Sequence, residues 1–237
     1  MKGLLIVVLL FLSLWVFAQD SIPPPANKYI FFPYPIARGT TRYSLGITNT
    51  AMPQDITEEV QVRAPAGDFH ILHGLPGGFY LDGRASIQFI QNHFSLGFRW
   101  THPINDRFSF SLGDDFAFWH GSLTIASFDT KAHGWMNYPN ASLGYRLDSD
   151  LLLTLKGEAL INLSSQSKVG GITVTDRAIK FNGWSASLMV EQPFYHKRSL
   201  TVGVRAMYTN FFWQTWSLFE TYDRNIFFPE IVTGFIF

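Results

Sequence analysis

The residues with the clearest capacity for chemistry are His120 and Ser122, which are separated by Gly121. Residues two apart in an extended strand share a face, so the imidazole and the hydroxyl would lie side by side. Asp129 and the pair Asp114-Asp115 supply carboxylates nearby. A nucleophile beside a base that an acid orients is the arrangement of nucleophilic catalysis. A His-x-Ser tripeptide is common by chance, so we keep an enzyme as the alternative and not as the main prediction.

The histidines do not predict a metal site. His70 and His73 have a spacing that would suit metal ligands on a helix, but Gly74, Pro76 and Gly77 follow and oppose a helix. The chain has no Cys, and no carboxylate cluster completes a ligand set. No glycine-rich phosphate loop, zincin motif or G-x-S-x-G motif occurs either. We therefore predict neither a metal nor a cofactor.

Alternation of apolar and polar residues is the dominant pattern. From Ser199 to Thr209, Leu200 and Val202 alternate with Thr201 and Gly203. Such alternation predicts strands with one apolar and one polar face, and no stretch after the N-terminal region has a convincing helical period. Eight segments carry the pattern: 41–49, 93–101, 107–119, 137–147, 151–163, 183–191, 199–209 and 227–237.

The segment 107–119 contains an interruption at Gly113-Asp114-Asp115. If the register continued without a break, Asp114 would lie on the apolar face. A carboxylate on a face that meets lipid is unfavourable, so we expect a β-bulge near Gly113 that shifts the register.

The links between these segments predict a closed barrel. Short links such as 103–106, 148–150 and 193–198 alternate with longer ones at 51–86, 121–133, 164–179 and 211–225, of which 51–86 is the longest. This asymmetry is typical of transmembrane barrels, whose sheet must close because lipid cannot satisfy an open edge. Charged residues make up only 15% and aromatics 16% of the chain, as a lipid-facing exterior requires. A soluble sandwich is the alternative, but the polar face is rich in small residues that fit a narrow lumen. We predict an all-β, eight-stranded, antiparallel up-and-down transmembrane β-barrel over residues 40–237.

The N-terminal region predicts export. Residues 1–18 have a positive Lys2, an apolar run and a small residue at Ala18, which together indicate a secretory signal peptide. The apolar run is too short for a membrane-spanning helix, which needs about 20 residues. Residues 19–39 form a proline- and aromatic-rich extension that we place in the periplasm. The net charge is 0, which argues against a nucleic-acid partner.

The polar faces of the predicted strands carry both signs of charge, which we place in the lumen. Unpaired charge there would be costly, so these side chains are expected to pair and to close the interior. An eight-stranded barrel is only wide enough for side chains to fill. The predicted lumen charge network is Arg42, Arg99, Asp115, Arg146, Lys156, Glu158, Glu191, Arg205 and Glu230.

The chain ends in an alternating aromatic segment, Thr233-Gly234-Phe235-Ile236-Phe237. With the signal peptide and the alternating strands, this ending resembles the small outer-membrane barrels of Gram-negative bacteria of the OmpA, OmpX and OmpW kind. The resemblance implies that Phe235 and Phe237 form a signal for the barrel-assembly machinery. The residues around Gln19 also resemble exported proteins of Bacteroidota. Lipid A deacylase barrels are similar in size and use a His, a Ser and an acid, which implies a role for His120 and Ser122 in the alternative.

Two aromatic clusters outside the predicted strands are candidates for partner contact. They would be badly placed in water, and aromatic anchors are common at interface centres. The alternative is that they tuck against the barrel or lie at the membrane interface. The candidate residues are Tyr29, Phe31, Phe32, Tyr34, Phe212, Trp213 and Trp216.

We therefore predict a non-enzymatic protein of the bacterial outer membrane, embedded among outer-membrane lipids. Its lumen is closed, and it serves as a structural or accessory subunit beside another envelope protein. A lipid-active enzyme is the first alternative and a small-solute pore is the second.

Overall fold

A computed structural model describes residues 25, 28–53, 63–125, 128–147, 150–169, 172–176, 179–195, 198–216 and 224–237. The predicted signal peptide lies outside the described residues. Within them, no helix is long and apolar enough to cross a membrane. The strands are β1 (Thr41–Ala51), β2 (Arg63–Gly74), β3 (Phe79–Ile87), β4 (Gln91–Pro103), β5 (Phe108–Ile125), β6 (Phe128–Arg146), β7 (Leu152–Val169), β8 (Ile172–Asp176), β9 (Lys180–Phe194), β10 (Arg198–Thr209) and β11 (Ile226–Ile236).

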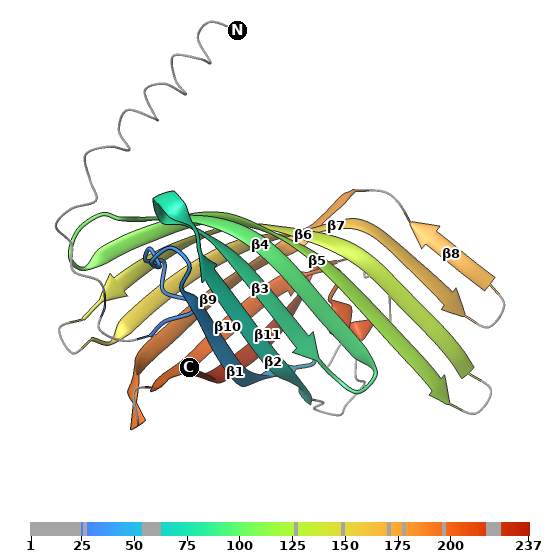
Figure 1. The fold of residues 1–237 in the computed structure, drawn as a ribbon. Coiled ribbons are helices and arrows are strands. Elements are labelled where there is room, and N and C mark those ends of the chain that lie inside the picture. The colour runs from blue at the N-terminus through green and yellow to red at the C-terminus, as the bar shows by residue number, and fades with distance from the viewer. Residues whose placement is uncertain are drawn as a thin grey trace, which may run out of the picture.

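The strands form a closed antiparallel barrel (Figure 1). Each strand pairs with its neighbour in the chain, except that β7 pairs with β9 and the short β8 lies beside the outer part of β7. The ring closes where β1 pairs with β11, with Leu45 opposite Phe235. Because β8 is outside the ring, ten strands make the barrel wall.

The prediction of eight strands was therefore wrong by two. The missing strands, β2 and β3, lie in the segment that we assigned to the long first loop. Pro65, Gly67 and Gly74 obscure the alternation in β2. The pattern in β3 is regular, with Tyr80 and Asp82 facing inward, but the strand is short and follows a Pro-Gly-Gly turn, the 3₁₀ turn η1 (Pro76–Gly78).

The apolar faces point outward and the polar faces inward, as predicted. Leu96 is 61% exposed and Leu45 59%, whereas Arg99 and Lys156 are buried inside the barrel. On β11, Phe227, Ile231 and Phe235 lie on the outer face, and Glu230 lies on the inner one. This orientation shows that the exterior is built for an apolar surrounding and the lumen for polar contacts.

The expected bulge at Gly113 is absent. The pairing of β5 with β4 and with β6 runs without a shift past this residue. Asp114 therefore does lie on the outer face, and Asp115 lies on the inner one. The exposed carboxylate of Asp114 accepts a hydrogen bond of 2.6 Å from the side-chain amide of Asn137 on β6. A local amide partner thus replaces the change of register that we expected.

The two ends of the barrel differ. All four turns at the end that holds Phe237 are short, whereas the opposite end carries the links 52–62 and 210–225. Following the usual orientation of outer-membrane barrels, we name these the periplasmic end and the outer end. Strands β5, β6 and β7 are 18, 19 and 18 residues long and continue past the other strands at the outer end (Figure 1). Much of what we assigned to the loops 121–133 and 164–179 is therefore strand.

Candidate functional site in the barrel interior

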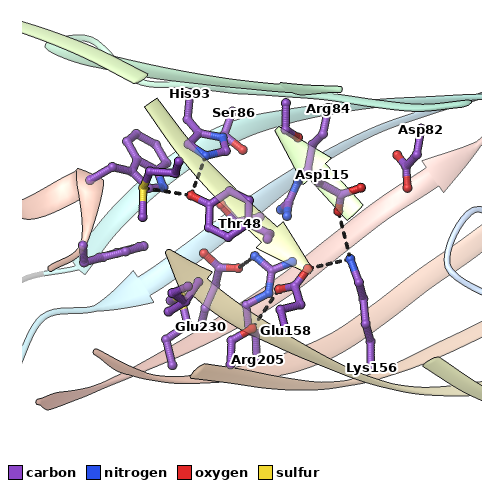
Figure 2. Close-up of a pocket in the computed structure, with 18 of the residues that line it drawn as sticks. Thr48, Asp82, Arg84, Ser86, His93, Asp115, Lys156, Glu158, Arg205 and Glu230 are labelled. Carbon is purple, nitrogen blue, oxygen red and sulfur yellow. Dashed lines mark hydrogen bonds and ion pairs between the residues drawn. The ribbon is translucent and has the colours of Figure 1, made fainter. Parts of the chain in front are cut away.

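A chain of ion pairs crosses the middle of the lumen. Arg99 on β4 contacts Asp82 on β3 at 2.5 Å and Asp115 on β5 at 3.2 Å. Lys156 on β7 continues the chain, because its ammonium lies 3.5 Å from Asp115 and 2.5 Å from Glu158. Figure 2 shows Lys156 between these two carboxylates. The chain joins four strands across the lumen, so the charges compensate one another where water is scarce.

Polar side chains complete this chain. Ser185 donates a hydrogen bond of 2.7 Å to Glu158, and the amide of Asn140 donates one of 3.1 Å to Asp115. The imidazole of His70 contacts Asp82 through its Nε2 atom. Ser185 and His70 bind carboxylate oxygens that the cations do not contact, whereas Asn140 binds the Asp115 oxygen that Arg99 and Lys156 also contact.

Two further ion pairs flank the central chain. Arg205 on β10 contacts Glu230 on β11 at 3.1 Å, and Thr50 donates a hydrogen bond of 2.9 Å to the same carboxylate. Arg84 on β3 contacts Asp68 on β2 at 2.6 Å, and Ser86 donates to Asp68 at 3.1 Å. The acidic partners Asp68 and Glu230 are buried, and Arg84, Arg205 and Glu230 line the same central space (Figure 2).

Of the nine charges predicted for the lumen, six lie in this central network: Arg99, Asp115, Lys156, Glu158, Arg205 and Glu230. Arg42 and Glu191 lie nearer the periplasmic end, where they hold the N-terminal segment. Arg146 lies at the rim and contacts Asp150 at 2.7 Å, outside the network.

Sequence reasoning missed four members of the network, namely Asp68, His70, Asp82 and Arg84. All four lie on β2 and β3, which we assigned to a loop. With them, the acidic members of the network are Asp68, Asp82, Asp115, Glu158 and Glu230, and the basic ones are Arg84, Arg99, Lys156 and Arg205, with the imidazole of His70 beside Asp82.

The periplasmic end of the lumen is filled by residues 29–36, which we call the periplasmic plug. The backbone N–H groups of Ile30, Phe31 and Phe32 all donate to the carboxylate of Glu191 on β9, at 2.7, 3.0 and 2.8 Å. Glu191 is fully buried. Arg42 donates a hydrogen bond of 3.2 Å to the carbonyl of Tyr29 and lies 3.8 Å from the centre of its ring. The plug is thus fixed by its backbone to one buried carboxylate.

The aromatic residues of this plug face the interior of the barrel. Tyr29, Phe31 and Phe32 are buried in one cluster with Leu72, Tyr80 and Ile236, and Tyr34 packs against it. Burial raises the pKa of Tyr29, whose hydroxyl donates a hydrogen bond of 2.9 Å to the carbonyl of Pro35. Of the two interpretations of this segment, the structure has the one in which the aromatics tuck into the barrel base. Tyr29, Phe31 and Phe32 offer no exposed surface to a partner, whereas Tyr34 is half-buried.

The outer end is closed by residues 211–216, which we call the outer plug and which include the short 3₁₀ turn η3 (Trp213–Thr215). Phe212 packs on Phe228 with ring centres 5.1 Å apart, and Trp213 stacks on His93 at 5.2 Å. Phe212, Trp213 and Trp216 are all buried, so this second group of candidate contact residues also faces inward. Aromatic packing closes this mouth of the barrel.

A small internal cavity of about 70 Å³ remains between the plugs and the ion pairs. This volume holds a few water molecules. Its lining includes Arg84, Lys156 and Glu158 together with Phe31 of one plug and Trp213 of the other. In the described part of the chain, no group of three or more potential metal ligands occurs. The interior between the two plugs is therefore a polar core with little free space.

His120 and Ser122 share the outer face of β5, as the alternation predicted, near the outer end of the barrel. His120 approaches Asn92 at 3.5 Å and Asp129 accepts from Thr124 at 3.0 Å. Among the described residues, no hydrogen bond joins His120 to Ser122 or to Asp129. The three residues are not arranged as a triad in this structure.

The C-terminal residues Phe235 and Phe237 lie on the outer face at the periplasmic end, and each is 41% exposed. The backbone N–H of Phe237 donates a hydrogen bond of 2.9 Å to the carbonyl of Tyr43, and its ring contacts Arg198. These residues close the seam between the first and last strands. Their recognition by the assembly machinery stays a prediction.

Comparisons with known proteins extend to the fold alone. No family model and no curated protein matches the sequence. Among solved structures, Neisserial surface protein A is similar with a TM-score of 0.38 and 15% identity, over 83% of this chain and 94% of that one. The attachment invasion locus protein Ail of Yersinia pestis gives 0.40 and 11%, over 84% and 99%. The translocator domain of the autotransporter NalP from Neisseria meningitidis gives 0.42 and 12%, over 85% and 89%. No residue role is carried from them to this chain.

Proposed function

We propose that this protein is a non-conducting and non-enzymatic β-barrel of the bacterial outer membrane that serves as a structural or accessory component of the envelope. One observation carries the proposal. Three successive layers of the chain's own residues occupy the lumen: the periplasmic plug, the ion-pair network and the outer plug. A barrel built in this way acts through its outer surface and loops, because its interior is occupied by its own side chains.

The network favours this function over a pore. A solute path needs polar groups that face an open channel and can exchange partners with the solute. Here Lys156 and Arg99 each bridge two carboxylates, and those carboxylates accept further hydrogen bonds from Ser185 and Asn140. Opening a path would break several buried ion pairs at once, and each broken pair leaves an uncompensated charge.

Recording from single barrels in planar lipid bilayers tests the proposal. We expect the complete protein to give no steady conductance, and deletion of residues 28–37 alone to leave the bilayer closed because the network and the outer plug remain. A second variant would also replace residues 211–216 by a Gly-Ser linker and convert Lys156 and Glu158 to Ala. This variant should conduct, and it serves as the positive control that the assay detects an open barrel. Steady conductance by the complete protein would refute the proposal.

The enzyme alternative has its own test. Ser122→Ala should leave the acylation of lipid A in the host membrane unchanged, as measured by mass spectrometry. The accessory role is tested by purification in mild detergent followed by mass measurement. A second envelope protein at fixed stoichiometry is expected. A monomer that carries no partner under several detergents would contradict that part of the proposal.

A further inference from the structure

The outer face of β5, β6 and β7 carries a group of basic and polar side chains beyond the aromatic rows. We call it the outer basic patch and define it as His120, Ser122, Lys131, His133, Gln166 and Lys168. The strand pairing brings these residues together, because His120 is opposite His133, which is opposite Gln166. In the next row Ser122 is opposite Lys131, which is opposite Lys168.

Lys131 and Lys168 are opposite each other on neighbouring strands, and this pair indicates what the surface binds. Directly opposed residues on neighbouring strands have Cβ atoms about 5 Å apart, and like charges at that separation destabilise a sheet. Both lysines are exposed on the outer side. A bound anion between the two ammonium groups would convert this repulsion into attraction.

A register shift between β6 and β7 places Lys168 on the outer face, opposite Lys131. The pairing of β6 with β7 shifts at Trp135/Met136, so Asn162 is opposite Met136 while Ser164 is opposite Trp135. Before the shift, even-numbered residues of β7 such as Lys156 face the lumen. After it, Ser167 is buried and Lys168 is exposed. Bulges often redirect a side chain at a functional position, and this one moves a lysine from the lumen side to the outer face.

The patch borders the apolar belt. Phe118 and Trp135 form the row below it, with ring centres 5.0 Å apart, and both histidines lie 6.2 Å from Phe118. A shallow, open depression lies over this region, lined by Phe118 and Trp135 together with Ser122, Lys131 and the two histidines. Lys131 lies two rows beyond Phe118, about 10 Å along the membrane normal for a strand tilted by about 40°. A lysine that extends along the surface reaches the headgroup layer from there.

We propose that the outer basic patch binds the phosphate of a phosphorylated lipid in the outer leaflet, with the acyl chains lying along Phe118 and Trp135. Lys131 and Lys168 pair with the phosphate, and the two imidazoles, the Ser122 hydroxyl and the Gln166 amide supply further hydrogen bonds. Asp129 is the acidic group on the same face of β6, and it lies beyond Lys131, on the side away from the belt. The inference does not depend on the closed lumen, because an open barrel could hold the same lipid.

Purified full-length protein in phosphatidylcholine nanodiscs tests the proposal, with bisphosphorylated lipid A added and retained lipid counted by native mass spectrometry. Each lysine beside an anionic surface is worth about fivefold in affinity, so K131Q/K168Q should lose roughly 25-fold. The double variant K28Q/R38Q removes the same charge from exposed residues at the periplasmic end and should bind as the wild type does. Lipid A without its phosphates should bind at least tenfold more weakly than the phosphorylated form.

Thermal unfolding supplies a second readout that distinguishes a site from a general charge effect. In phosphatidylcholine alone, Lys168→Gln should unfold at the same or a higher temperature than the wild type, because it removes a like-charge contact. With lipid A present, the wild type should unfold at a higher temperature than Lys168→Gln. Equal binding of the dephosphorylated lipid, an equal loss in the K28Q/R38Q control, or an equal stabilisation by inorganic phosphate alone would each overturn the proposal, the last because it indicates a site for free phosphate.

Discussion

The two plugs close opposite ends of one barrel by different means. The periplasmic plug is held by polar contacts to its backbone, since three consecutive N–H groups meet the single buried carboxylate of Glu191. The outer plug is held by packed rings. Its hydrogen bonds to the wall run from the amide of Gln91 to the carbonyl of Gln214 at 3.0 Å and between the backbone of Phe211 and the hydroxyl of Thr209, at the end of β10. Charge-assisted hydrogen bonds fix a conformation, whereas apolar packing tolerates adjustment.

This difference indicates which end can rearrange. Within the described residues, the side-chain amide of Gln214 has no hydrogen-bond partner, and neither does the indole N–H of Trp216. Every backbone N–H from Ile30 to Phe32 has one. Unsatisfied buried polar groups raise the free energy of a packed state. The outer plug should therefore open first under mechanical force or on contact with a ligand, and the periplasmic plug should stay closed.

The largest expected effect comes from replacing one buried polar side chain at each end by leucine. Glu191→Leu leaves three buried N–H groups without an acceptor and should lower the free energy of unfolding by about 3 kcal/mol or more. Gln214→Leu removes an amide that has no partner among the described residues, so its effect should stay within about 1 kcal/mol. Urea unfolding in lipid vesicles, followed by tryptophan fluorescence, measures both. Similar losses for the two variants would abolish the proposed distinction.

A smaller effect should come from two inward glycines against which the plugs rest. A Cβ at Gly144 would lie 2.6 Å from the ring of Phe32 and 2.7 Å from Pro33, and a Cβ at Gly121 would overlap the indole of Trp216. Overpacking costs about 1–3 kcal/mol, depending on whether the neighbour can move. Because Glu191 fixes the periplasmic plug, Gly144→Ala should fall at the upper end of this range and Gly121→Ala at the lower end.

The outward Gly157 provides the matched control for this pair, because a Cβ there meets nothing within 4 Å. Gly157→Ala should leave the free energy of unfolding unchanged or slightly higher. Proteolysis in vesicles adds a second measurement. Gly121→Ala should expose the 210–225 link to added protease, while Gly144→Ala should not. Equal exposure would mean that the outer plug is as firmly held as the periplasmic one.

The sequence predicted the barrel wall better than it predicted the plugs, for physical reasons. Alternation reports which face of a strand meets lipid, so the orientation of Arg205, Lys156 and Ile231 followed directly from spacing. The plugs carry no such period. Phe31 and Trp216 are as apolar as residues at an interface with a partner, and only the fold shows that the barrel itself covers them. The ion pairs of Asp82 and Arg84 were missed because one short strand was assigned to a loop.

The contact of Arg42 with Tyr29 should contribute less than the contacts of Glu191. Arg42 lies over the Tyr29 ring and donates to its backbone carbonyl. A cation over an aromatic face is worth about 1 kcal/mol at a partly exposed site. Arg42→Met should lose about that amount, and Arg42→Lys should lose about half because the ammonium keeps the charge but not the planar stacking. If both variants unfold as the wild type does, Glu191 alone fastens the plug.

The smallest expected effect is a difference between the two ends in how their contribution to the free energy of unfolding depends on alkaline pH. The outer plug, Phe211 to Trp216, contains no ionisable side chain, whereas the periplasmic plug contains Tyr29, whose pKa is raised by burial. A tyrosine in the unfolded chain ionises near pH 10, before the buried one does. Below that pH the stabilising contribution of neutral Tyr29 is complete, and it declines as the pH rises above it, because only the unfolded state then releases its proton.

Tyr29→Phe removes this titration and also the hydrogen bond to Pro35. Its free energy of unfolding should therefore be lower than that of the wild type at neutral pH, by about 1 kcal/mol, and the gap should narrow above pH 10. Unfolding curves in vesicles across the alkaline range measure the gap. A gap of constant size would show that Tyr29 ionises equally in both states, and hence that the periplasmic plug does not shield its hydroxyl from water.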